Sequence, residues 1–178
     1  MKVLGIPGSL RTTSSNAALL RAAAGVAPPG TELVIYDGVA GLPYFSPDLD
    51  VEPLPPPVAA LRAQLAAVDA WAISSPEYAH GIPGALKNAL DWLVSATEPL
   101  GKPVLLVSAS PSGAPFAHAH LLEVLRTMAS HVIDAGGHVF SRAKLDDHGH
   151  VTDPALLAAL ATGFHQLAAA RTGLLADA

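Results

Sequence analysis

The chain has 178 residues, of which 51% are hydrophobic and 14% are charged, and its formal net charge is -5. This composition excludes a disordered or collagen-like chain, and the acidic balance argues against DNA or RNA as a partner. Cysteine is absent, which excludes disulfides, thiolate nucleophiles and iron–sulfur clusters. The length suits one compact domain, so we expect residues 1–178 to form a single domain.

The sequence shows no membrane-directed segment. The first ten residues carry one lysine and an apolar run that is broken at Pro7 and Gly8, which is too short for a signal peptide. No apolar run reaches the roughly 18 residues that a membrane-spanning helix needs. We therefore expect a cytoplasmic protein that does not act at a membrane.

Short apolar runs alternate with helical patterns along the chain. The runs predict strands at 3–6, 33–35, 71–73, 104–107 and 139–140. The helical patterns predict helices at 17–24, 57–67, 82–94 and 118–135, and a last helix that begins at Pro154 after the cap Asp153. Gly136 and Gly137 are expected to end the fourth helix. Apolar strands separated by helices predict an α/β fold with a parallel sheet that is covered on both faces.

The segment 37–56 is rich in proline and glycine and is long for a connection between a strand and a helix. We interpret it as a surface loop near the functional site. Tyr44 and Phe45 either form part of a wall of that site or belong to an ordinary surface loop.

The loop after the first strand, GSLRTTSSN at 8–16, leads directly into a helix. Its hydroxyl groups, including those of Ser9, Ser14 and Ser15, could bind phosphate oxygens together with the helix N-terminus, and Arg11 would supply positive charge. The alternative is that serine and threonine only cap the helix and that Arg11 lies in solvent. The loop lacks the Walker lysine and the spaced glycines of a dinucleotide fold, so a monophosphate is the favoured ligand.

The loop after the third strand contains two prolines and two glycines, which fix an unusual backbone path. Its motif SPEY-x-HGIPG-x-LKNALDW, together with GSLRxxSxN, closely resembles the NADPH-dependent FMN reductase family, which includes flavin, quinone, chromate and azo-dye reductases. The resemblance covers nearly the whole chain. It implies a flavodoxin-like three-layer sandwich with strand order 2-1-3-4-5, FMN as the cofactor, and NADPH or NADH as the co-substrate.

The resemblance also implies roles for individual residues. Ser9, Arg11, Ser14 and Asn16 would hold the FMN phosphate, and Pro76, Glu77 and Tyr78 would contact the isoalloxazine ring. The family usually has asparagine where this chain has Ala79, which can offer the flavin only its backbone groups. In the loop 108–114, Ser110 and Gly113 would lie at the pyrimidine edge of the ring. No side chain is expected to be catalytic, since the flavin carries the chemistry.

These features predict an enzyme that passes electrons from a nicotinamide through FMN to a flavin, a quinone or a similar small acceptor. The alternatives are a flavodoxin-like electron carrier that does not oxidise nicotinamides, and a chain that kept the fold but lost flavin binding. A Ser-His-Asp hydrolase is not favoured, because the sequence has no G-x-S-x-G elbow.

We also predict no metal site, because the histidine pairs at 118 and 120 and at 148 and 150 lack ligand spacing. The family further suggests a homodimer or homotetramer with Asn88, Asp91 and Trp92 at or near the contact, although Trp92 could instead lie wholly within one subunit's core.

Overall fold

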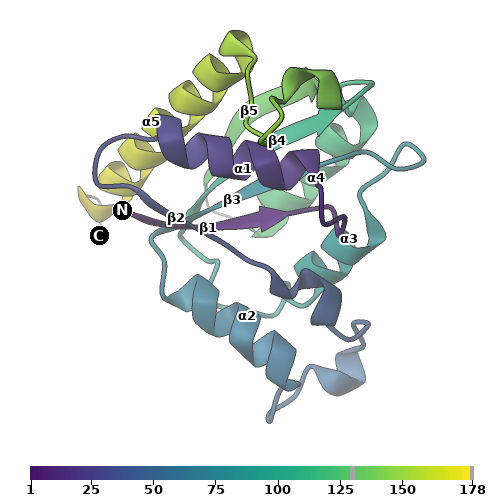
Figure 1. Cartoon of the computed structure of the whole chain (residues 1–178). Coiled ribbons are helices and arrows are strands. Elements are labelled where there is room, and N and C mark those ends of the chain that lie inside the picture. Colours follow the sequence, from purple (N-terminus) through teal and green to yellow (C-terminus); the bar gives the residue numbers. More distant parts are fainter. Residues whose placement is uncertain (129–130, 177–178) are drawn as a thin grey trace.

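A single sheet of parallel strands forms the middle layer of the molecule (Figure 1). The computed structural model describes residues 1–128 and 131–176. In this part of the chain the sheet has the strand order β2-β1-β3-β4-β5, as the family resemblance predicted. The strands are β1 (Lys2–Pro7), β2 (Glu32–Ile35), β3 (Ala70–Ser75), β4 (Pro103–Ser110) and β5 (His131–Val139).

Helices cover both faces of this sheet. They are α1 (Ser15–Val26), α2 (Pro56–Ala66), α3 (Gly84–Asp91), α4 (Pro115–Met128) and α5 (Pro154–Ala176). Helices α1 and α5 share one hydrophobic cluster with the sheet, and α2, α3 and α4 share the cluster on the opposite face. Strands β3 and β4 are buried along their whole length, which is why their sequences are almost uniformly apolar. The predicted fold class is confirmed.

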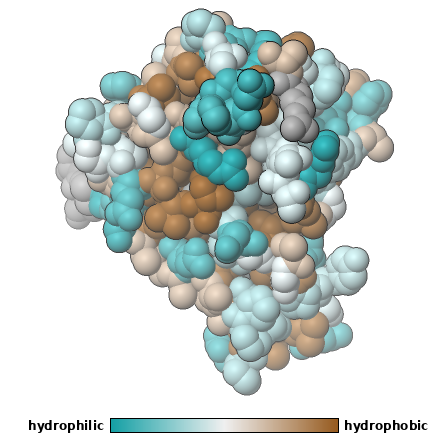
Figure 2. All heavy atoms as spheres, in the orientation of Figure 1, coloured by the Kyte–Doolittle hydropathy of each residue, from teal (hydrophilic) through white to brown (hydrophobic). Residues whose placement is uncertain are grey.

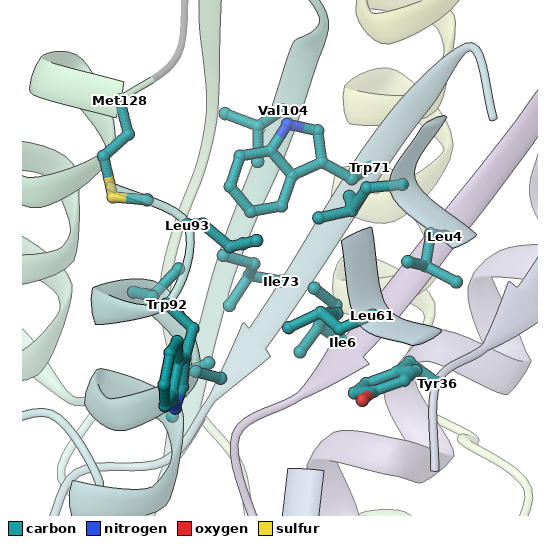
Figure 3. Packing of buried hydrophobic residues seen from close by; sticks show 14 of the residues in the cluster. Leu4, Ile6, Tyr36, Leu61, Trp71, Ile73, Trp92, Leu93, Val104 and Met128 are labelled. Carbon is teal, nitrogen blue, oxygen red and sulfur yellow. The ribbon is translucent and has the colours of Figure 1, made fainter. Parts of the chain in front are cut away.

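Packing between β3 and the helices is tight on the face that carries α2 and α3. Figure 3 shows Ile6, Trp71 and Ile73 from the sheet packed together with Leu61 and Leu93. Leu61 and Trp71 are fully buried. Each buried leucine contributes about 1.5–3 kcal/mol by leaving water, so this cluster fixes the sheet against its helices.

Local sequence signals explain where three helices begin. The Ser14 hydroxyl accepts a hydrogen bond from the Ala17 amide at 3.2 Å and caps α1. The Asp153 carboxylate accepts from the amides of Ala155 and Leu156 at 3.0 and 3.1 Å, which confirms the predicted cap of α5. The Lys144 ammonium, together with the Leu156 amide, lowers the pKa of this carboxyl. Helix α3 begins only after Pro83 and is shorter than the predicted helix 82–94.

The prediction of a helix over 118–135 is wrong at its C-terminal end. Helix α4 ends at Met128, and the next apolar residues, Val132 and Ile133, pair with β4 as part of β5. Gly136 and Gly137, which were expected to end a helix, lie inside β5. Strand β5 is therefore much longer than the predicted strand 139–140.

The edge strand β2 is short. It has four residues, and its Val34 side chain is 41% exposed. Figure 2 shows hydrophobic and polar areas side by side on the face that carries α1 and β2. A short edge strand with an exposed charge at Glu32 offers little for another strand to pair with. In the described residues, no helix combines the length and apolarity needed to cross a bilayer.

Candidate functional site

A cleft of about 250 Å³ lies at the carboxyl ends of the strands. Such a crevice at the strand ends is where open α/β sheets bind ligands. Nine of the eleven predicted cofactor-binding residues line it: Ser9, Arg11, Ser14, Ser15, Asn16, Pro76, Glu77, Tyr78 and Ser110. Ala79 and Gly113 do not line it. The loops after β1, β3 and β4 thus meet as their position in the sheet predicted.

The loop after β1 presents polar groups to this cleft. The Arg11 amide donates to the Ser9 hydroxyl at 3.4 Å, and the Arg11 side chain is exposed. Ser14 caps α1, as the alternative interpretation expected, and it also lines the cleft. The N-terminus of α1 therefore points its first amides and its partial positive charge at the cleft.

Asn16 ties three elements together. Its side chain is buried, its Nδ2 donates to the Ala109 carbonyl at 3.1 Å, and its Oδ1 accepts from the Ser74 hydroxyl at 2.8 Å. These bonds join α1 to the ends of β3 and β4. Oδ1 and one Nδ2 hydrogen are engaged within the protein, which leaves the second Nδ2 hydrogen and the backbone of Asn16 to bind a ligand.

The loop after β3 contains a tight reversal. Tyr78 and Gly81 exchange backbone hydrogen bonds of 3.2 and 3.0 Å, and the two residues between them, Ala79 and His80, have φ of 49° and 57°. Positive φ at both central positions is the geometry of a type I′ turn, which favours asparagine and glycine. Ala79 is therefore held in a conformation that its side chain opposes, and it lies outside the cleft.

Glu77 does not point freely into the cleft. Its Oε2 accepts hydrogen bonds from the amides of Phe116 and Ala117 at 2.8 and 2.9 Å. These amides belong to the first turn of α4. Beside them, the rings of His80 and Phe116 stack with their centroids 4.2 Å apart. The loop after β3 is thus fastened to the start of α4.

The loop after β4 depends on close backbone packing. Ser110 lines the cleft, and its carbonyl accepts from the amides of Gly113 and Phe140 at 3.1 and 2.8 Å. Gly113 has φ of 83°, and its carbonyl oxygen lies where a Cβ on Gly137 would be only 2.3 Å away. Gly113 therefore shapes the loop from behind the cleft.

Comparison with known proteins places this chain in a family. A model of the NADPH-dependent FMN reductases matches residues 1–144. The chain belongs to that family.

Relatives of this FMN reductase family member are similar over most of their length. It is 36% identical over 159 residues to an NAD(P)H-dependent FMN reductase of Pseudomonas aeruginosa, which covers 86% of this chain and 85% of that protein. It is 35% identical over 130 residues to a quinone reductase of Escherichia coli, which covers 70% of this chain and 69% of that protein. A solved structure of FerB, a flavoenzyme NAD(P)H:(acceptor) oxidoreductase from Paracoccus denitrificans, matches with a TM-score of 0.80 and 25% identity over 97% of each chain. The predicted family and enzyme class are confirmed: the protein is an oxidoreductase that uses FMN and NAD(P)H.

The cleft of this reductase fits FMN in charge and in the groups that it presents. Among the described residues, the arginine ion pairs are those of Arg62 and Arg171, so Arg11 is not committed to a carboxylate. Arg11, the serine hydroxyls and the N-terminus of α1 together suit a phosphate dianion. The carboxylate of Glu77 uses its Oε2 to bind α4.

A Ser-His-Asp arrangement lies behind the cleft. His118 is hydrogen-bonded through Nδ1 to the Ser108 hydroxyl at 2.9 Å and through Nε2 to the Asp134 carboxylate at 2.8 Å. Ser108 is fully buried, so a substrate has no path to its hydroxyl. The arrangement joins β4, α4 and β5 and does not serve as a hydrolytic triad.

The segment 37–56 lies against α3 and does not line the cleft. The Asn88 side-chain amide and the Trp92 indole N–H donate to the Pro43 carbonyl at 2.9 and 2.8 Å, and the Phe45 backbone amide donates to Asn88 Oδ1 at 2.8 Å. The Phe45 ring packs edge-on against Trp92, and Tyr44 is 91% exposed. Neither Tyr44 nor Phe45 lines the cleft at the strand ends. Trp92 is fully buried within this chain, which decides between the two predicted placements.

Five lining residues were not among the predicted site residues: Thr13, Ala109 and Pro111 lie within the predicted loops, and Phe140 and Ser141 lie outside them. Phe140 and Ser141 follow β5 and line the cleft beside Ser110. The strand order supplies the signal that could have found them, because β5 is the neighbour of β4 and its carboxyl end faces the same edge.

Proposed function

We propose that this cleft holds FMN with its phosphate at the loop 9–16 and its ring against Pro76–Tyr78, and that the enzyme reduces quinones or free flavins with NAD(P)H. FMN held in this cleft would supply the redox chemistry that links hydride transfer from the nicotinamide to reduction of the acceptor. The observation that carries the proposal is the meeting of a cationic, hydroxyl-rich helix N-terminus with the Pro76–Tyr78 loop in one cleft. The Ser9 and Tyr78 hydroxyls are 3.3 Å apart, and their hydrogen bond joins the loop 9–16 to the Pro76–Tyr78 loop.

The residues of this chain divide the work between binding and positioning. Ser9, Arg11, Ser14 and Ser15 bind the phosphate through hydroxyl, amide and guanidinium groups. Asn16 positions the loops, since both polar atoms of its side chain are engaged within the protein.

The ring is held by the other two loops. Pro76 and Tyr78 support it on one side, and Ser110 lies at its pyrimidine edge. Ala79 and Gly113 act through the backbone turns that they shape, because neither lines the cleft.

The alternative function, an electron carrier of the flavodoxin type, has less support. Tyr78 and Phe140 are the aromatic residues among the lining side chains, and of these Tyr78 is 51% exposed and Phe140 only 2%. The cleft therefore offers one exposed aromatic ring and no pair that could enclose a flavin on both faces. This leaves access for a planar substrate.

Anaerobic reduction separates the two functions. We expect NADPH or NADH to bleach the protein-bound FMN without an acceptor, and turnover with a panel of benzoquinone, free FMN, chromate and an azo dye to identify the acceptor class. If both nicotinamides leave the flavin oxidised while dithionite reduces it, the protein is a carrier and the proposal fails.

The phosphate site is tested with FMN and riboflavin as paired ligands. Replacing Arg11 with alanine removes a charge-assisted bond, so FMN affinity should fall by about 1.5–3 kcal/mol while riboflavin affinity stays the same. Arg126→Ala is the matched control, since Arg126 is exposed on α4 and does not line the cleft. Equal affinity of the native protein for FMN and riboflavin would contradict a phosphate site.

We further propose a homodimer or homotetramer in the cytoplasm, where NAD(P)H is supplied. Leu10 and Tyr78 are 55% and 51% exposed and line one shallow groove beside the cleft, which supports burial of this surface by a second copy. Light scattering should give a multiple of the 18.1 kDa chain mass. A monomer at micromolar concentration would contradict the oligomer.

A further inference from the structure

Glu77 bridges two elements that are far apart in sequence. It stands two residues after the end of β3, yet its Oε2 lies 2.8 Å from the Phe116 amide and 2.9 Å from the Ala117 amide, in the first turn of α4. The first amides of a helix have no partner within the helix. Here a carboxylate from another loop supplies the acceptor that Ala114 and Pro115 cannot supply with their own side chains.

The chain around α4 is arranged to present these amides. Gly113 and Ala114 have φ of 83° and 56°, so the backbone reverses sharply just before α4 begins. On the other side of the contact, His80 stacks on Phe116. Two independent contacts thus hold the loop after β3 against the start of α4.

We propose that Glu77 is a positioning residue that fixes the spacing between the two loops of the FMN cleft and places a negative charge beside it. This rests on the proposed function, because the loops in question are those that carry Pro76 and Tyr78 on one side and Ser110 on the other. Glu77 acts on the cofactor through the α4 contact, and its charge acts through space.

The negative charge of Glu77 should lower the reduction potential of bound FMN. The N-terminus of α4 carries about half a positive charge, and the carboxylate of Glu77 adds a full negative one, so the pair is negative overall. Reduction adds negative charge to the flavin, which a neighbouring negative charge opposes. Glu77 therefore holds the reduction potential of bound FMN lower than a neutral side chain would.

Two substitutions separate geometry from charge. Glu77→Gln keeps a side-chain oxygen that can accept from both amides, whereas Glu77→Ala removes the acceptor. We expect Glu77→Ala to weaken FMN binding by about 10- to 100-fold, because two charge-assisted bonds that order the cleft are lost. Glu77→Gln should restore affinity to within about threefold of the native protein and raise the midpoint potential of bound FMN.

Amide hydrogen exchange of the FMN-free protein tests the cap on its own. The amides of Phe116 and Ala117 should be protected in the native protein and in Glu77→Gln, and should exchange about tenfold faster in Glu77→Ala. Glu123→Ala, an exposed change on the same helix, is the matched control and should alter none of these measurements.

The outcomes separate this inference from the proposed function. Unchanged exchange at Phe116 and Ala117 in Glu77→Ala overturns the cap. Faster exchange with native FMN affinity, or an unshifted potential in Glu77→Gln, overturns the role toward the cofactor. Protected amides in a native protein that does not bind FMN would refute the proposed function while the cap itself stands.

Discussion

Replacing Asn16 with alanine tests whether one buried amide holds the cleft together. The change removes the bonds to the Ala109 carbonyl and from the Ser74 hydroxyl, and it leaves both of these groups buried without a partner. Each net hydrogen bond is worth about 0.5–1.5 kcal/mol, and each buried group left unpaired adds about 1–3 kcal/mol. Water entering the space left by the side chain offsets part of this cost, so we expect the free energy of unfolding to fall by about 2–4 kcal/mol.

Urea unfolding of the FMN-free protein measures this loss, and a double-mutant cycle with Ser74→Ala assigns it. Because the double variant has no unpaired Ser74 hydroxyl, its loss should be smaller than the sum of the single losses by about 1 kcal/mol. FMN affinity should fall in parallel, since Ala109 and Ser110 line the cleft. A loss below about 0.5 kcal/mol in Asn16→Ala would refute the reasoning, because it would mean that these bonds contribute nothing net.

Three further outcomes follow from features elsewhere in the chain. Gly137→Ala should lower the melting temperature sharply, because its Cβ would lie 2.3 Å from the Gly113 carbonyl oxygen; Gly25→Ala, with open space around it in α1, should stabilise by about 0.5–1 kcal/mol, and equal effects would contradict the packing argument. The Lys2 amide and then Arg171 lower the pKa of the Asp69 carboxyl, so the stability that Asp69 provides is present above its unfolded pKa of about 3.9 and is lost as pH falls through the lower folded value. Urea titrations should therefore show Asp69→Asn to be less stable than the native protein by up to about 1 kcal/mol at pH 7, with the difference shrinking as the pH falls through the folded pKa, and a constant difference would argue against the ionised carboxylate. Initial rates at several fixed acceptor concentrations should give parallel double-reciprocal lines, because one open cleft admits one planar substrate at a time, and intersecting lines would show that both bind together.

The central strands and the cap residues are the parts of the fold that local sequence specifies. Strand β3 reads as AWAISS and is buried throughout, so its apolar run has one simple interpretation. Asp153 caps α5 through its own neighbours, and this too is visible in sequence. The boundary between α4 and β5 is different. Leu121, Leu125 and Met128 form a buried helical stripe, and Val132 continues its spacing, so periodicity alone extends the helix into a strand.

The candidate site divides in the same way. The residues of the loop 9–16 and of Pro76–Tyr78 could be predicted, since each follows a recognisable strand and carries its own motif. The partner of Glu77 could not, because it lies 39 residues away at an amide that every residue type offers. Phe140 was missed because the last strand was predicted at 139–140, whereas β5 spans His131–Val139 and Phe140 follows its end.

The attachment of segment 37–56 to α3 has a consequence for engineering. Pro43 receives side-chain donors from Asn88 of α3 and from Trp92 just after it, and Phe45 returns one amide to Asn88. Asp50 accepts from Arg62 and Ser95, and the Phe45 ring packs against Trp92. None of its residues lines the cleft at the strand ends. A foreign loop grafted between the end of β2 and the start of α2 would therefore have to return one carbonyl and one amide to Asn88 and Trp92, an acceptor to Arg62, and apolar side chains in place of the buried Val39 and Leu42.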